Sequence, residues 1–161
     1  MLTTIVGRRG RGKTTLIKQL IAESDADRVC ILDFLGDFTD LTDPRIEISR
    51  GYLYPFLKNV WETCPDYKKT LVVLDEIDCY SKYDEYISYV YKYGRHGAIE
   101  IIAVSRSFMD LPVISRRLTD VYYLFQITEF IDLQYLSRHK GWEFAEKVKN
   151  LDFYEYMKIG L

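Results

Sequence analysis

The chain has 161 residues, of which 48% are hydrophobic and 29% are charged, and its formal net charge of −2 corresponds to a pI of about 5.7. This length and composition exclude a disordered or fibrous protein and fit one soluble domain over residues 1–161. The slightly acidic balance excludes attraction of the whole protein to nucleic acid, so any contact with DNA has to be local.

No apolar run approaches the roughly 20 residues that are needed to span a bilayer. The first ten residues, MLTTIVGRRG, also lack the basic-then-apolar layout of a signal peptide. We therefore expect a cytoplasmic protein without a membrane span. Cys30, Cys64 and Cys79 show no metal-ligand spacing, and we expect them to be reduced thiols.

Short β-branched runs alternate along the chain with segments of helical spacing, a pattern typical of a parallel sheet covered by helices. In chain order the expected strands are Leu2–Val6, Val29–Leu32, Pro44–Ser49, Thr70–Leu74, Ile99–Val104 and Val121–Gln126. The expected helices are Lys13–Glu23, Tyr54–Cys64, Asp84–Tyr93, Val113–Leu118 and Phe130–Lys149, the last in two pieces broken near Gly141.

The first chemical motif lies between the first expected strand and the first expected helix. It matches the phosphate-loop pattern G-x-x-x-x-G-K-[ST] at every position, and with the residue after it comprises Gly7, Arg8, Arg9, Gly10, Arg11, Gly12, Lys13, Thr14 and Thr15. Glycines let consecutive backbone N–H groups face an anion, and the helix adds its positive end. We expect the loop to bind ATP, with Lys13 on the β- and γ-phosphates and the Thr14 hydroxyl on Mg²⁺.

The second motif is an apolar strand that ends in two adjacent carboxylates, Asp75 and Glu76. We expect Asp75 to hold Mg²⁺ beside Thr14, and Glu76 to orient or deprotonate the attacking water. Two acids with separate tasks suit hydrolysis, because such a base in a small-molecule kinase would waste ATP on water. Asp78 is interpreted as a solvent-facing or helix-capping acid.

A catalytic glutamate at this position implies an additional strand between the two motif strands, and Ile99–Val104 is the candidate. Ser105, at the tip of this strand, is a candidate sensor of the γ-phosphate. The fold expected is therefore a three-layer α/β P-loop NTPase with a mostly parallel central sheet, of the type with an additional strand and a catalytic glutamate.

The second half of the chain carries a further order of motifs. It reads Gly94-Arg95-His96-Gly97, Ile99–Val104, Ser105-Arg106, Asp110-Leu111-Pro112, Asp120 and Phe125. This order resembles the HerA–FtsK superfamily of DNA-pumping ATPases, which includes viral genome-packaging ATPases. The run Val29–Asp33 followed by Gly36-Asp37 is similar to that family's second strand.

The resemblance implies a role for one arginine in particular. Arg95 matches the arginine that family members insert into the ATP site of the neighbouring subunit, and Arg106 is the competing candidate, acting in cis or in trans. Many members have Gln or Asn at the sensor position, where this chain has Ser105.

An arginine acting in trans implies a homo-oligomeric ring with its sites at subunit boundaries. The resemblance further implies double-stranded DNA as the translocated partner and a possible capsid or portal partner, in the host cytoplasm if the protein is viral. Basic residues between the two motifs, such as Arg45 and Lys69, are indistinguishable in sequence from ordinary solvated residues.

Two other functions stay open. One is a small nucleotide or metabolite kinase, although the arginine-rich lid and monophosphate pocket of those enzymes are not found. The other is a Zot-like assembly or secretion ATPase, in which nearly the same fold would serve a different partner. An AAA+ loader fits less well, because the last 30-odd residues are few for a helical lid domain.

Overall fold

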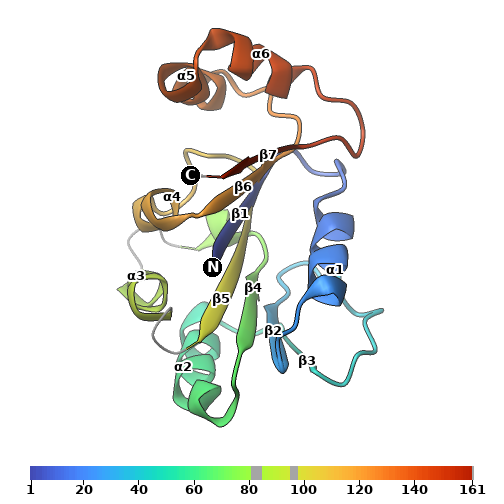
Figure 1. The fold of residues 1–161 in the computed structure, drawn as a ribbon, viewed down its shortest axis with the longest axis vertical. Coiled ribbons are helices and arrows are strands. Elements are labelled where there is room, and N and C mark those ends of the chain that lie inside the picture. Colours follow the sequence, from blue (N-terminus) through green and yellow to red (C-terminus); the bar gives the residue numbers. More distant parts are fainter. Residues whose placement is uncertain (81–84, 95–97, 161) are drawn as a thin grey trace.

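The computed structural model describes residues 1–80, 85–94 and 98–160 of the chain. Its centre is a seven-stranded sheet with the order β3-β2-β4-β5-β1-β6-β7 (Figure 1). The strands are β1 (Leu2–Val6), β2 (Arg28–Leu32), β3 (Ile46–Ser49), β4 (Thr70–Leu74), β5 (Ile99–Ser105), β6 (Val121–Leu124) and β7 (Met157–Gly160). All neighbouring pairs are parallel except β6 and β7, which are antiparallel.

Helices cover both faces of this sheet. The described ones are α1 (Lys13–Glu23), α2 (Leu53–Thr63), α3 (Glu85–Tyr93), α4 (Val113–Leu118), α5 (Phe130–Lys140) and α6 (Trp142–Lys149), with short 3₁₀ turns at Cys64–Asp66 and Ile77–Cys79. Helix α1 lies on one face, α2, α3 and α4 lie on the other, and α5 and α6 lie beyond the β6–β7 side (Figure 1). The expected three-layer fold is therefore confirmed.

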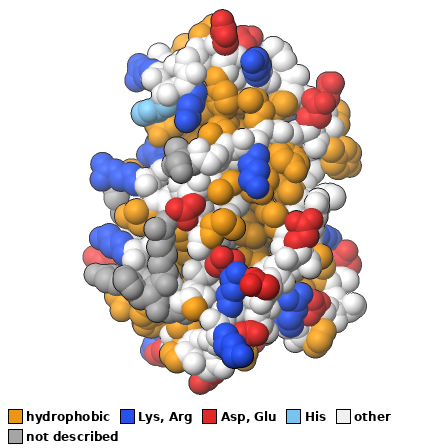
Figure 2. Space-filling view, viewed as in Figure 1, with side chains coloured by type: hydrophobic (Ala, Val, Ile, Leu, Met, Phe, Trp, Pro, Cys, Tyr) orange, Lys and Arg blue, Asp and Glu red, His pale blue; other side chains and the backbone are white. Residues whose placement is uncertain are grey.

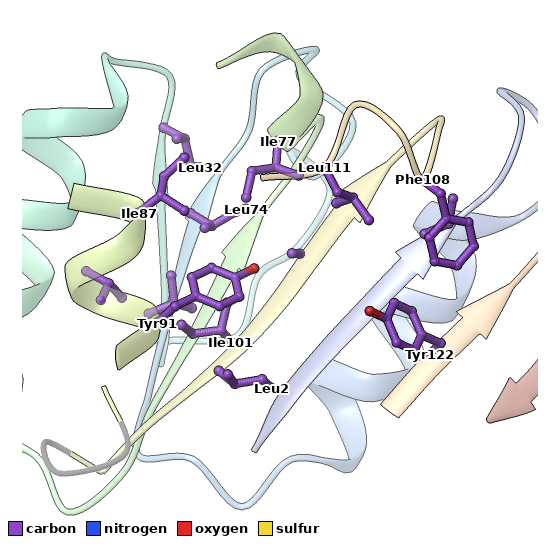
Figure 3. Close-up of a cluster of buried hydrophobic side chains, with 14 of the residues drawn as sticks. Leu2, Leu32, Leu74, Ile77, Ile87, Tyr91, Ile101, Phe108, Leu111 and Tyr122 are labelled. Carbon is purple, nitrogen blue, oxygen red and sulfur yellow. The ribbon is translucent and has the colours of Figure 1, made fainter. Parts of the chain in front are cut away.

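The central strands are buried on both faces, so most of their residues are apolar and do not alternate with polar ones. Leu32 and Leu74 point into one core with α2 and α3, whereas Ile31 and Val73 point into the other with α1. Figure 3 shows the larger core, in which the ring of Tyr91 from α3 lies over the sheet. Two cores hold the sheet rigid between its helices.

Strand β5 lies between the two motif strands, as the sequence predicts. Its register pairs Ser105 with Val6 of β1 and Ala103 with Leu74 of β4. Because all three strands are parallel, their carboxyl ends meet at one edge of the sheet. The phosphate loop and the Asp75-Glu76 pair therefore leave the same edge, one strand apart.

The predicted elements differ from the structure mainly at the end of the chain. The break of the last helix at Gly141 is confirmed, while β6 ends at Leu124, two residues before the predicted Gln126. Strand β7 was not predicted, because its four residues carry only a weak alternation and two of them are exposed. No helix in the described part of the chain is both long and apolar enough to cross a membrane.

Candidate functional site

The loop between β1 and α1 is anchored at its base to both strands that flank β1. The N–H of Gly7 donates to the carbonyl of Ser105 at 3.2 Å, and the N–H of Arg8 donates to the carbonyl of Gln126 at 3.2 Å. These bonds continue the sheet ladder into the loop. The start of the loop is therefore fixed by the sheet, and its next residues turn into α1.

Two glycines of the loop are required by close packing. A Cβ on Gly7 would lie 2.5 Å from the Cβ of Phe125, closer than two non-bonded carbon atoms approach each other. Gly12 has φ of +102°, a left-handed conformation that disfavours side chains, and a Cβ there would lie 2.6 Å from the ring of Tyr154. The glycine spacing of the motif thus reflects both conformation and space.

The ammonium group of Lys13 lies on the loop itself. Its Nζ donates to the carbonyls of Gly7 at 2.7 Å and Arg8 at 3.0 Å. Burial lowers the pKa of Lys13, and the nearby carboxylates of Glu76 and Asp75 oppose that shift. A cation in this place faces any anion that the loop surrounds.

Asp75 and Glu76 leave the end of β4 in different directions. The N–H of Asp75 donates to the carbonyl of Leu32 at 3.1 Å, so the sheet ladder reaches one residue beyond the strand. Glu76 then adopts φ of +49°, an uncommon conformation for a residue with a side chain. Because the backbone turns here, the adjacent carboxylates are presented separately, as two distinct tasks require.

Both carboxylates are buried, and both are harder to ionise than usual. Burial, then the negative charge of Glu76, raises the pKa of Asp75 to about 7, against an opposing effect of Lys13. Burial, then the charge of Asp78, raises the pKa of Glu76, while Arg106 opposes the shift. A raised pKa brings Glu76 closer to the range in which a general base works well near neutral pH.

A hollow of about 340 Å³ lies over the loop and brings most of the predicted residues together. From the predicted set it is lined by Arg9, Gly10, Gly12, Lys13, Thr14, Thr15, Asp75 and Glu76. Four lining residues were not predicted as site residues, namely Leu35, Asp37, Val104 and Tyr154.

Asp37 reaches the hollow through the turn that follows β2. The carboxylate of Asp33 is fully buried and accepts hydrogen bonds from the N–H groups of Gly36 at 2.7 Å, Asp37 at 3.0 Å and Phe38 at 3.3 Å. This turn fixes the backbone and leaves the Asp37 side chain exposed. The sequence signal was the run Asp33 to Asp37 after an expected strand, because the carboxyl ends of parallel strands meet at the same edge of a sheet.

Arg106 binds two acids of the same chain. Its Nε lies 2.9 Å from Oε2 of Glu76 and 2.9 Å from Oδ2 of Asp78. The expectation that Asp78 faces solvent or caps a helix is wrong, because its side chain is only 4% exposed and holds this arginine. The ion pair with Arg106 offsets the cost of burying a carboxylate that the sequence alone places at a surface turn.

Ser105 does not line the hollow. Its side chain is fully buried, and its hydroxyl donates to the carbonyl of Ser107 at 2.7 Å and accepts from the Ser107 N–H at 3.2 Å. The hydroxyl thus closes a local turn. This geometry gives no support to the role of Ser105 as a γ-phosphate sensor, which stays a prediction.

Among the described residues, three arginines of the predicted site, Arg8, Arg11 and Arg106, do not line the hollow. Arg8 is exposed and Arg11 is half-buried. Arg95 lies outside the described residues, so its predicted role in a neighbouring subunit stays a prediction.

The oxygen ligands available in the hollow fit a Mg²⁺ ion that is bound together with a nucleotide. Within residues 1–80, 85–94 and 98–160 no group of three or more His, Cys, Asp or Glu side chains is arranged to hold a metal ion. Mg²⁺ commonly takes only one or two protein oxygens beside phosphates and waters, and Thr14 and Asp75 both line the hollow. Burial, then the charge of Glu76, raises the pKa of Asp75, and a cation beside it would oppose that shift.

Comparison with known protein families shows which family this chain belongs to. The sequence model of a family described as "AAA domain" matches residues 1–132, from β1 to the start of α5. The chain belongs to the AAA domain family. This AAA domain is a P-loop ATPase domain, and the matched region contains both the phosphate loop and the Asp75-Glu76 pair. The family label differs from the resemblance described above, but both identify a P-loop ATPase.

Solved structures match the fold of the AAA domain along nearly its whole length. The genome packaging NTPase B204 from Sulfolobus turreted icosahedral virus 2, in complex with ATP-gammaS, superposes with a TM-score of 0.79. The two sequences are 22% identical, and the match covers 99% of this chain and 91% of the other. The expected resemblance to viral packaging ATPases is thus confirmed at the level of the fold.

More distant structures share the core of the fold. The N-terminal domain of zonular occludens toxin from Neisseria meningitidis matches with a TM-score of 0.53 and 18% identity, over 76% of this chain and 74% of that one. The ATPases 2 and 3 of EccC from Thermomonospora curvata match with a TM-score of 0.60 and 8% identity, over 78% and 30%. No curated protein sequence matches this AAA domain.

Proposed function

We propose that this AAA domain hydrolyses Mg·ATP to ADP and phosphate and uses the energy to move double-stranded DNA as a subunit of a ring. The observation that carries the proposal is the likeness of fold to a genome packaging NTPase over 99% of the chain. The arrangement of the loop, Asp75 and Glu76 around one hollow supports the hydrolytic part.

In the proposed reaction the loop N–H groups and Lys13 hold the phosphates, and Thr14 and Asp75 hold Mg²⁺. The metal ion would neutralise charge that develops on the transferred phosphoryl group. Glu76 then accepts a proton from the attacking water. Its proton affinity suits this task, because burial and Asp78 raise its pKa.

Arg106 bears on the same step, since its guanidinium occupies one oxygen of Glu76 at 2.9 Å. A base held in an ion pair is less available to water, so Arg106 has to move or share Glu76 during turnover. Half of the Arg106 side chain is exposed, which leaves it room to do so. The arginine donated across a subunit boundary would then be Arg95.

DNA binding in this proposal depends on local charge. On the face drawn in Figure 2, basic and acidic side chains are interspersed. Arg45 is bound by Asp43 and by the carbonyls of Ser24 and Ala26, and Lys69 is paired with Asp25 and Glu100. Both have structural partners, and we propose that positive charge is collected only where subunits of a ring come together.

The test is the rate of ATP hydrolysis with and without double-stranded DNA, in the wild type and in Glu76→Gln. We expect DNA to stimulate the wild type, and Glu76→Gln to keep ATP binding while losing about 10²–10⁴-fold in turnover. If DNA of any length leaves the rate of ATP hydrolysis unchanged, at low salt and high protein concentration, the proposal of a DNA motor is refuted.

A second candidate is an assembly ATPase, favoured by the likeness of fold to the N-terminal domain of zonular occludens toxin. Such a protein would keep the loss of turnover in Glu76→Gln but show no response to DNA. A small-molecule kinase would instead need an acceptor substrate for ADP production, and would release little phosphate without it.

A further inference from the structure

The segment between α6 and β7 lies over the phosphate loop, although it is more than 130 residues away in sequence. An ideal Cβ on Gly12 would lie 2.6 Å from Cδ1 of Tyr154, so the ring lies directly against that glycine. Tyr154 also lines the hollow with Lys13, Thr14 and Thr15. An aromatic ring is therefore built into the wall of the nucleotide site.

The backbone around Tyr154 is held in place at both ends. The N–H of Asp152 donates to Oε2 of Glu155 at 3.0 Å, and the N–H of Glu155 donates to the carbonyl of Asp152 at 3.3 Å. Within this turn Tyr154 has φ of +64°, which is uncommon for an aromatic residue. The turn therefore fixes a conformation that the residue would not adopt alone.

Neighbouring aromatic residues attach the segment to the rest of the site. The Arg11 guanidinium lies 4.1 Å from the centre of the Phe153 ring, which ties the segment to the phosphate loop. The Tyr156 ring packs 5.5 Å from Phe125 and 5.3 Å from Tyr123. Tyr154 lies between these anchors, yet the residue stays 67% exposed. A large ring held in place but left uncovered is available to a ligand.

The strand order indicates which part of a bound nucleotide lies next to the Tyr154 ring. Asp75 and Glu76 leave β4, two strands from β1 on one side, and Tyr154 precedes β7, two strands from β1 on the other. The γ-phosphate has to face Glu76 for hydrolysis. The nucleoside then leaves the loop on the opposite side, toward Tyr154.

We propose that Tyr154 stacks on the base of the bound nucleotide and that residues 150–156 form the nucleoside wall of the site. The inference deepens the proposed function, because it rests on ATP binding in this hollow. Base–aromatic stacking tolerates different bases, so Tyr154 contributes affinity for nucleotides over bare polyphosphate rather than strict selectivity for adenine.

Calorimetric titration of the whole chain with Mg²⁺ and either AMPPCP or inorganic tripolyphosphate tests this. We expect Tyr154→Ala to weaken AMPPCP binding about 5- to 150-fold and to change tripolyphosphate binding less than about twofold. Tyr154→Phe keeps the ring and should bind AMPPCP within about twofold of the wild type. Tyr52→Ala, which removes an 84% exposed tyrosine in the loop before α2, is the matched control.

Equal losses for both ligands in Tyr154→Ala would overturn base stacking, since the ring would then support only the phosphate loop. Unchanged AMPPCP affinity in Tyr154→Ala would overturn it as well. The binding test of Tyr154 can succeed or fail independently of the test for DNA-stimulated hydrolysis. A wild type that ignores DNA, combined with the selective loss in Tyr154→Ala, would refute the motor and leave the base-stacking role in place.

Discussion

The Nε of Arg106 lies 2.9 Å from Oε2 of Glu76, so the proposed catalytic base is held by a cation of its own chain. The same Nε lies 2.9 Å from Oδ2 of Asp78, whose buried side chain fixes the arginine from the other side. The arginine therefore links the end of β5 to the end of β4. Burial and Asp78 raise the pKa of Glu76, and the charge of Arg106 opposes that shift, which leads to the first prediction.

Replacing Arg106 with alanine should move the pH dependence of hydrolysis. Arg106 opposes the upward shift in the pKa of Glu76, so without it that pKa rises further. Because a general base has to be deprotonated, the acidic limb of the kcat profile should move to higher pH. Steady-state rates between pH 5 and 9 measure this, with Arg106→Lys as the control that keeps the charge. A uniform loss of rate without a displaced limb would instead favour Arg106 as the arginine that touches phosphate.

Asp75 should make the protein less stable as the pH rises. Its pKa is about 7 in the folded chain against an ordinary value of 3.8, so between these values only the unfolded chain has lost the proton. The free energy of unfolding therefore falls through this window, and the penalty is complete above pH 7. Asp75→Asn should then stabilise the protein by an amount of order 1–4 kcal/mol more at pH 8 than at pH 4.5.

Urea unfolding of both proteins in EDTA, at the two pH values, gives this difference directly. EDTA is needed because a divalent cation would favour the ionised carboxylate and reduce the penalty. The same stabilisation at both pH values would mean that Asp75 ionises normally in the folded protein.

Gly7→Ala should destabilise the domain as well as impair the loop. Its Cβ would lie 2.5 Å from the Cβ of Phe125, and φ is +155°, so we expect a loss of roughly 2–4 kcal/mol. Gly51→Ala is the control, because its Cβ would meet only Ser49 Oγ at 3.5 Å. That change should alter stability by less than about 1 kcal/mol. Comparable urea midpoints for the two variants would contradict the packing argument.

If sites are shared between subunits, Arg95→Ala and Glu76→Gln should complement each other. Each variant alone should have little turnover, since one lacks the donated arginine and the other lacks the base. In mixed assemblies a Glu76→Gln subunit can supply Arg95 to a neighbour with an intact Glu76, so part of the activity should return. Hydrolysis measured across mixing ratios checks this, and a double variant mixed with the wild type is the control. Activity that merely averages the two parents at every ratio would place the arginine in its own subunit's site or outside catalysis.

The sequence alone determined the fold class and the centre of the site. The phosphate loop and the Asp75-Glu76 pair are contiguous motifs, so their chemistry is readable from residue type and spacing. The apolar runs of β2, β4 and β5 are equally direct, because strands covered on both faces are mostly apolar. Placing β5 between the motif strands also followed from the glutamate.

Only the tertiary structure decided which residues from distant segments join that site. Tyr154 meets Gly12 because β7 pairs with β6 and returns the chain to the phosphate loop. Arg106 meets Glu76 and Asp78 because β5 and β4 are neighbours, while the hydroxyl of Ser105 is bonded to Ser107 and does not line the hollow. Contacts of this kind depend on strand order and on the direction of individual side chains. Neither leaves a periodic or contiguous pattern in the chain, and so neither was predictable from it.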